Sequence, residues 1–146
     1  MIKVLIAEDD LMIADMIEAS LLENGYEVTG IARTVAEGVS LGRENRPDFA
    51  ILDMRLADDG LGTEIEAQLR DGPRIGILYA SGNVNQVIRL ADHDACIAKP
   101  YPTRDLMSAL KIVEQIVANG IVSLPFPRGF QLLGRGRPAA GELLHA

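Results

Sequence analysis

Five polar side chains stand directly after short apolar runs of the sequence, where a scaffold can deliver reactive groups. They are Glu8 and Asp9, Asp53, Ser81, and Lys99. Three carboxylates that lie close together repel one another unless a cation joins them. Ligation by oxygen alone suits a hard ion, and Mg²⁺ fits best because it uses one or two carboxylates and keeps places for water and phosphate oxygens. A carboxylate beside such an ion and a lysine is suited to act as the nucleophile in phosphoryl transfer.

The elements that must position these residues are predicted from the spacing of the apolar residues. Apolar runs predict five strands, and helical periodicity predicts a helix after each strand. The strands are expected at 3–7, 27–32, 49–53, 75–80 and 95–98, and the helices at 11–24, 34–44, 63–70, 84–90 and 103–118. Five βα units in series predict an α/β fold, a doubly wound five-stranded parallel sheet with helices on both faces. Ligands bind outside the carboxyl ends of the strands in such a sheet, so the five polar side chains are expected to converge there.

Other notable residues are given structural interpretations. Asp10 is expected to cap the first helix, and the segments 34–37 and 63–66 both have the spacing of a capping box. His93 lies in a polar loop and is expected on the solvated surface. Cys96 excludes an intramolecular disulfide because it is the only cysteine, and we expect it to be a small core residue and not a redox sensor.

The composition describes one compact domain with an acidic body. The chain has 146 residues, 48% of them apolar, and a formal net charge of −7. Residues 1–120 hold 20 acidic and 11 basic residues, whereas residues 121–146 hold one acidic and three basic residues. An acidic body repels phosphate groups, so neither nucleic acid nor a membrane is expected as a partner. Because the sequence has no long apolar run and no signal peptide, we expect a cytoplasmic protein.

Residues 121–146 are expected to form a separate arm after a domain that spans residues 1–120. Four glycines and three prolines are too many for a helix or a central strand, so the arm is expected to lack regular structure, and it is too short for an effector domain. A solvated linker would carry fewer large apolar groups, so we expect the arm to pack on its own domain or on a second subunit, and we predict a homodimer through the last helices and the arm. The apolar members of the arm are Phe126, Phe130, Leu132, Leu133, Leu143 and Leu144, and its arginines, Arg128, Arg135 and Arg137, are a weak signal for phosphate binding.

Four segments together resemble the receiver domain of two-component response regulators, over residues 1 to about 119. They are Leu-Ile-Ala-Glu-Asp-Asp at 5–10, Ile-Leu-Asp-Met-Arg-Leu at 51–56, Ala-Ser-Gly at 80–82 and Ala-Lys-Pro-Tyr at 98–101. The resemblance implies a flavodoxin-like receiver fold with the strand order 2-1-3-4-5. It also implies a signalling module and not an enzyme. The only chemistry of this module would be Mg²⁺-dependent self-phosphorylation and autodephosphorylation.

The resemblance assigns the acceptor and the metal ligands. It implies that Asp53 accepts a phosphoryl group from a histidine kinase or a histidine phosphotransfer protein. Asp9 would bind Mg²⁺ directly and Glu8 through water, with Asp53 and the backbone carbonyl of Arg55 completing the metal site.

The resemblance also assigns the phosphate-binding and switch residues. Ser81 takes the place of the switch Thr or Ser, and Lys99, before a cis Pro100, contacts the phosphate. Receivers usually carry Tyr or Phe two residues into the fifth strand, where this chain has Cys96, so the usual aromatic gate is absent. The segment Tyr-Ala-Ser-Gly at 79–82 resembles the Phe-Ala-Thr-Gly signature of stand-alone receivers linked to HWE-type or phytochrome kinases.

The loop after the acceptor departs from the receiver pattern. Receivers usually place Pro four residues and Gly eight residues after the acceptor, and here these positions are Ala57 and Leu61, with Gly60 and Gly62 on either side of the latter. We therefore expect a rebuilt loop, and this departure bears on the role of Arg55 in the metal site.

Two enzyme classes are disfavoured, and two signalling functions stay open. A haloacid-dehalogenase-like phosphatase needs a second Asp two residues after its nucleophile, where this chain has Arg55. A flavodoxin-like cofactor site needs a phosphate-cradling loop after the first strand, and the acidic segment 8–10 would repel the phosphate. The chain is then either a single-domain response regulator with output by phosphorylation-dependent protein–protein interaction, or a phosphate sink that competes for a shared kinase without its own output.

Overall fold

The computed structural model describes residues 1–133, and residues 134–146 lie outside the described part of the chain. Strands and helices alternate up to residue 119, and a short strand follows. The elements are β1 (Lys3–Ala7), α1 (Leu11–Glu23), β2 (Glu27–Ala32), α2 (Val35–Asn45), β3 (Phe49–Leu52), α3 (Gly62–Leu69), β4 (Gly76–Ser81), α4 (Val84–Leu90), β5 (Ala95–Ala98), α5 (Thr103–Asn119) and β6 (Phe130–Leu132).

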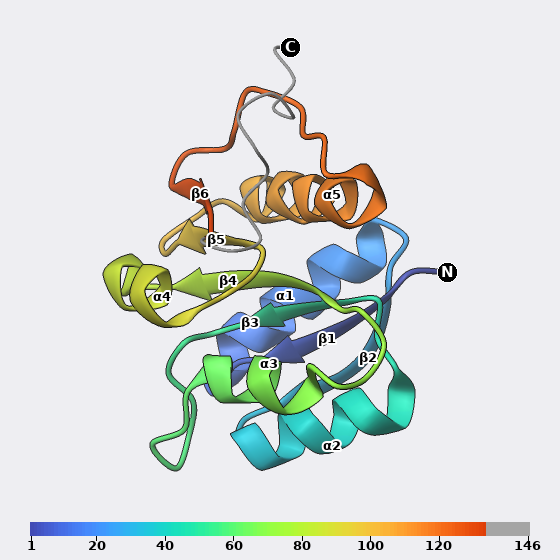
Figure 1. Cartoon of the computed structure of the whole chain (residues 1–146), viewed down its shortest axis with the longest axis vertical. Helices are drawn as coiled ribbons and strands as arrows, with labels where there is room; N and C mark the ends of the chain where they lie inside the picture. Colours follow the sequence, from blue (N-terminus) through green and yellow to red (C-terminus); the bar gives the residue numbers. More distant parts are fainter. Residues whose placement is uncertain (134–146) are drawn as a thin grey trace.

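The sheet has the predicted order for its first five strands and gains one more strand at the edge. The order is β2-β1-β3-β4-β5-β6, and the first five strands are parallel (Figure 1). Every residue of β3 and β4 is buried, as expected for central strands with helices on both faces. The doubly wound fold and the order 2-1-3-4-5 are thus confirmed.

Two hydrophobic clusters cover the two faces of the sheet. Successive side chains of a strand point to opposite faces, so Val4 and Ile6 of β1 belong to the cluster with α1 and α5, whereas Leu5 and Ala7 belong to the cluster with α3 and α4. Figure 1 shows α1 and α3 on opposite sides of the sheet. The helices therefore fix the sheet from both sides, and only its edges and the strand ends meet solvent.

Side-chain caps set the beginning of α1 and α2. An oxygen of Asp10 accepts hydrogen bonds from the backbone N–H groups of Met12 and Ile13, and the capping box between Thr34 and Glu37 is formed. The second predicted capping box, at 63–66, is wrong. Residue 61, a leucine, occupies the N-cap position of α3, and Glu66 instead points inward, where it accepts a hydrogen bond from the hydroxyl of Tyr79 at 2.6 Å.

The loop between β3 and α3 forms a small hairpin. Leu56 N–H donates to the carbonyl of Gly60 at 2.9 Å, and Gly62 N–H donates to the carbonyl of Met54 at 2.7 Å, which closes a small hairpin with Asp58 and Asp59 at its tip. The tip residues have φ angles of 61° and 58°. A Cβ atom at position 62 would meet the backbone carbonyl of Asp53, so glycine is required there, one residue later than in the usual receiver pattern.

The arm is not entirely irregular, which corrects one expectation. Residues 130–132 form β6, which pairs antiparallel with β5. The arm packs on its own domain: Val122 is fully buried, and the neighbouring Leu132 and Leu133 enter the two different clusters. Leu143, Leu144, Arg135 and Arg137 lie outside the described residues, and the homodimer stays a prediction.

Over residues 1–133, no helix combines the length and the apolar character needed to cross a membrane.

Gly62→Ala tests the close approach beneath Asp53. We expect the substitution to lower the free energy of unfolding by about 1–3 kcal/mol, because a backbone carbonyl cannot move aside as a flexible side chain can. Gly82→Ala is the matched control, since a Cβ there meets no atom within 4 Å, and its stability should stay within about 1 kcal/mol of the wild type. Urea unfolding at 25 °C measures both, and equal midpoints for the two variants would contradict the packing argument.

Candidate functional site

The three predicted carboxylates meet at the carboxyl ends of β1 and β3. One carboxylate oxygen from each of Glu8, Asp9 and Asp53 lies within 4.8 Å of the others. The pairing of β1 with β3 continues one residue past the strands, because Asp53 N–H donates to the carbonyl of Ala7 at 2.8 Å. The parallel sheet thus carries side chains 45 residues apart in sequence to one place.

Lys99 lies between two of these carboxylates. Its Nζ donates to Oε1 of Glu8 at 2.7 Å and to Oδ2 of Asp53 at 3.0 Å. Burial acts to lower the pKa of Lys99, but the hydrogen bonds and the charges of the two carboxylates outweigh it and raise the pKa above its ordinary value. The ammonium group therefore stays charged and links the end of β5 to the ends of β1 and β3.

Glu8 is the most buried member of the site. Its side chain is almost fully enclosed, and Asp10 N–H donates to its Oε2 at 3.1 Å. Burial raises the pKa of Glu8 to about 7, and the charge of Asp53 acts in the same direction, while the hydrogen bonds from Lys99 and Asp10 oppose it. A second positive charge at this place would favour the ionised form of Glu8.

The chemistry of the donors fits a hard divalent cation. All three ligating groups are carboxylates, and Asp9 and Asp53 are partly exposed, which leaves room for water and for a phosphate oxygen. The backbone of Arg55 pairs with Leu61, but the two hydrogen bonds that close this bridge run from Leu56 to Gly60 and from Gly62 to Met54. Neither bond uses the carbonyl of Arg55.

Ser81 lies at the same edge, but among residues 1–133 its hydroxyl forms no hydrogen bond with the carboxylates. It is the last residue of β4, and its carbonyl accepts a hydrogen bond from Lys99 N–H at 2.9 Å. Its hydroxyl oxygen accepts a hydrogen bond from Asn83 N–H at 3.0 Å, as a turn residue does. The assigned contact of Ser81 with a phosphoryl group stays a prediction.

Two further predicted positions lie on β5 or directly after it. The peptide bond between Lys99 and Pro100 is cis. Cys96 is fully buried in the cluster that also holds Tyr79 and Leu133, and burial raises the pKa of its thiol to about 11. The thiol therefore stays protonated and packs as a small apolar group.

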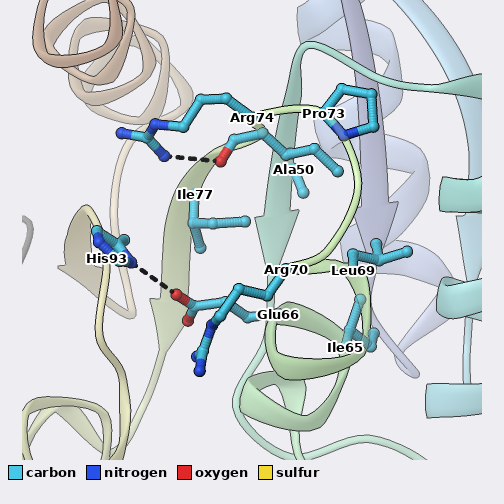
Figure 2. Close-up of a pocket in the computed structure, with 10 residues that line it drawn as sticks. Ala50, Ile65, Glu66, Leu69, Arg70, Pro73, Arg74, Ile77 and His93 are labelled. Atoms are coloured by element: carbon cyan, nitrogen blue, oxygen red, sulfur yellow. Dashed lines mark hydrogen bonds and ion pairs between the residues drawn. The ribbon is translucent and has the colours of Figure 1, made fainter.

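A polar cluster at the loop between α4 and β5 was missed from the sequence. His93 was expected on the solvated surface, but its Nδ1 lies 3.3 Å from Oε2 of Glu66, and Figure 2 shows the two side chains pointing toward one another. The neighbours of His93 are paired as well. Asp92 binds Arg70 at 2.8 Å, and the fully buried Asp94 binds Arg74 at 2.8 Å.

This cluster has a structural role. It borders a pocket of about 120 Å³ at the beginning of β4, the end of the strand away from the carboxylates. Asp94 also accepts a hydrogen bond from Ile77 N–H at 2.8 Å, and every buried side-chain nitrogen and oxygen of residues 1–133 has a partner. One feature of the sequence could have revealed this polar cluster. Glu66 lies on the apolar face of α3, one residue after the buried Ile65.

An apolar groove of about 210 Å³ lies beside the carboxylate site. Lys99 forms part of its wall, and the other lining residues are Ile13, Met16, Ile17, Pro100, Tyr101 and Thr103. Met16 of this lining is 58% exposed, and Met12, one turn earlier on α1, is 77% exposed. Exposed apolar groups around a groove are typical of a surface that contacts another protein.

Known proteins share this fold. Residues 4–111 match the family model described as the response regulator receiver domain. The transcriptional regulatory protein PdtaR of Mycobacterium tuberculosis is 32% identical over 113 residues, which are 75% of this chain and 55% of PdtaR. The acid tolerance regulatory protein ActR of Rhizobium meliloti is 30% identical over 111 residues, which are 73% of this chain and 56% of ActR. The chain thus spans about half the length of these curated relatives.

Solved structures agree with the family match. A CheY-like response regulator receiver domain protein from Methanospirillum hungatei superposes with a TM-score of 0.68 at 30% identity, over 79% of this chain and 95% of that one. The response regulator PhyR from Brucella abortus superposes with a TM-score of 0.63 at 25% identity, over 80% of this chain and 51% of that one. The family match over residues 4–111, the shared fold and the carboxylates gathered at the strand ends lead to one conclusion: the chain belongs to the response regulator receiver domain family, the signalling domains of two-component systems.

Proposed function

We propose that Asp53 accepts a phosphoryl group from a histidine kinase or a histidine phosphotransfer protein, and that other proteins read the phosphorylated state. The observation that carries this proposal is the position of the Lys99 ammonium between Glu8 and Asp53, next to three carboxylates that lie within 4.8 Å of one another. A nucleophilic carboxylate, a positive charge for a phosphoryl oxygen and a set of oxygen ligands stand at one open edge of the sheet.

Each residue of the site has a defined part in the transfer. A carboxylate oxygen of Asp53 forms the new O–P bond as the N–P bond of the donor histidine breaks, and the electron pair of that bond stays on the histidine nitrogen, which then takes up a proton. Lys99 offers its ammonium to a phosphoryl oxygen. A Mg²⁺ ion would be held by Asp9, Asp53 and the carbonyl of Arg55, with Glu8 acting through water, and it would supply positive charge to offset the charge of the phosphoryl oxygens.

Acetyl phosphate tests the acceptor without any protein donor. We expect intact-mass measurement to show one added phosphoryl group on the wild type in the presence of Mg²⁺, and peptide mapping to place it on Asp53. Asp53→Asn removes the nucleophile and should show no addition under the same conditions. A wild type that stays unmodified, or an Asp53→Asn variant that gains the same mass, would refute the proposed acceptor.

The metal site is tested by titration with Mg²⁺ alone. Asp9→Asn removes one negative charge from the ligand set, and we expect the affinity measured by calorimetry to fall by about tenfold or more. Asp15→Asn is the control, because Asp15 is exposed on α1 and lies outside the carboxylate group. Equal Mg²⁺ affinities for the two variants would contradict the assignment.

We further propose that the donor protein docks on the groove beside Lys99. A donor histidine must bring its phosphoryl group within bonding distance of Asp53, so the surface around the carboxylates must lie against the donor. The groove shares Lys99 with the site, and Met16 in its lining offers a flexible apolar contact. These features favour a donor that presents an apolar helix next to its histidine.

Met16→Asp separates protein docking from chemistry. We expect the rate of phosphotransfer from a histidine kinase that acts on the wild type to fall by about tenfold or more, with no change in modification by acetyl phosphate. Leu22→Asp places the same charge on the far end of α1, at a residue that is 56% exposed, and should leave both rates unchanged. A loss of kinase-dependent transfer that is equal in the two variants would count against the groove.

Output by protein–protein interaction is favoured over a phosphate sink by the structure of β5. The strand that directly precedes Lys99 also pairs with β6 of the arm, so a change at the site has a surface element to act on. A sink needs no such connection.

A further inference from the structure

Residues 129–133 of the arm occupy the edge of β5. Residues 130–132 pair antiparallel with residues 95–97, and two hydrogen bonds extend the pairing beyond the strands. Ala98 N–H donates to the carbonyl of Gly129 at 3.0 Å, and Leu133 N–H donates to the carbonyl of Asp94 at 3.1 Å. The arm thereby satisfies backbone groups that an edge strand would otherwise present to solvent.

Side chains of the arm fill both cores next to this edge. Leu132 is buried in the cluster with α1 and α5, and Leu133 is buried in the cluster that contains Cys96 and Val87. We call the edge of β5 that holds residues 129–133 the seat. Between the seat and the end of α5 the arm has a second attachment, since Ser123 N–H donates to Oε1 of Gln115 at 3.0 Å. The seat therefore recognises an extended backbone with two consecutive apolar side chains.

The seat is directly connected to the phosphoryl site. Ala98, whose N–H holds Gly129, is followed by Lys99, whose Nζ holds Glu8 and Asp53. Lys99 N–H also donates to the carbonyl of Ser81. A phosphoryl group on Asp53 gives the Lys99 ammonium a new anionic partner, and a shift of the Lys99 backbone toward it would move the end of β5 on which the arm is held.

We propose that the edge of β5 is a docking surface for an extended, uncharged strand of a partner protein, and that residues 129–133 occupy it as an internal ligand until phosphorylation weakens their hold. The second half of this proposal rests on the proposed function of Asp53. The partner pairs with β5 by main-chain hydrogen bonds, as β6 does. Its side chains follow the pattern of the arm, with two consecutive large apolar residues and no charge in residues 129–133.

The same connection acts in both directions. If phosphorylation favours the open edge, then a strand bound to the open edge favours phosphorylation by the same factor at equilibrium. The arm competes with the partner for one seat, so any change that weakens the arm strengthens partner binding.

Gly129→Ala opens the seat without touching the phosphoryl site. Gly129 has a φ of 77°, where a side chain is strained, and its Cβ would lie 3.2 Å from Cβ of Ala98. The probe is a fluorescent peptide with the sequence of residues 126–133, titrated against the full chain. We expect the variant to bind the peptide about fivefold to thirtyfold more tightly than the wild type does, because the strain weakens only the internal competitor.

Gly25→Ala is the matched control. Gly25 has a φ of 85°, but a Cβ there meets no atom within 4 Å, and the residue lies in the turn before β2. The variant carries similar backbone strain away from β5 and should bind the peptide as the wild type does. If Gly129→Ala fails to fold, Leu133→Ala replaces it, since the peptide then supplies the missing leucine. Equal peptide affinity in the arm variant, the control and the wild type would overturn the docking surface.

The link to phosphorylation is measured in the same assay. The wild type is titrated before and after treatment with acetyl phosphate and Mg²⁺, and the phosphoryl mass on Asp53 is determined in each sample. Tighter peptide binding by the phosphorylated protein supports the link, and unchanged binding by protein that carries the phosphoryl group overturns it. Protein that gains no phosphoryl mass refutes the proposed acceptor instead, while the comparison of Gly129→Ala with Gly25→Ala still decides the docking surface.

Discussion

The site is built around the ion pairs of the Lys99 ammonium with Glu8 and Asp53. The ammonium binds Glu8 at 2.7 Å and Asp53 at 3.0 Å, at an edge that gathers three carboxylates. One ammonium group stands against three carboxyl groups, so the site keeps an excess of acidic oxygen ligands that suits a divalent cation. The same ammonium ties the end of β5 to the ends of β1 and β3, which makes the chemistry of the acceptor and the position of β5 parts of one arrangement.

The fold supplies this arrangement through close backbone approach as much as through side chains. The pairing of β1 with β3 extends through Asp53 N–H to Ala7, and Gly62 allows α3 to begin directly against the carbonyl of Asp53. On the other side, Lys99 N–H binds the carbonyl of Ser81 and Ala98 N–H binds the carbonyl of Gly129. Ala98, which binds the arm, is thus the residue next to Lys99, which binds the acceptor Asp53. For this reason we regard the arm as part of the proposed response to phosphorylation and not as a passive extension.

Local patterns in the sequence predict most of this arrangement, and the errors have physical causes. Five apolar runs that alternate with helical periodicity were enough to predict the parallel sheet, and a parallel sheet brings Glu8, Asp53 and Lys99 to one edge. The strand β6 was missed because its three residues lie among glycines and prolines and form a strand only where β5 offers an open edge. The inward position of Glu66 and the partial burial of His93 were missed because each depends on a partner 13 or more residues away in sequence, which no local pattern shows.

The most direct test of this account is hydrogen exchange at the backbone N–H of Ala98 in the full-length wild type, before and after phosphorylation by acetyl phosphate with Mg²⁺. This amide is bound to Gly129 and stands next to Lys99, so it reports on the arm and on the site together. The account predicts faster exchange at Ala98 and at Leu133 in protein whose Asp53 carries the phosphoryl group. Unchanged exchange at both amides in fully phosphorylated protein would contradict it.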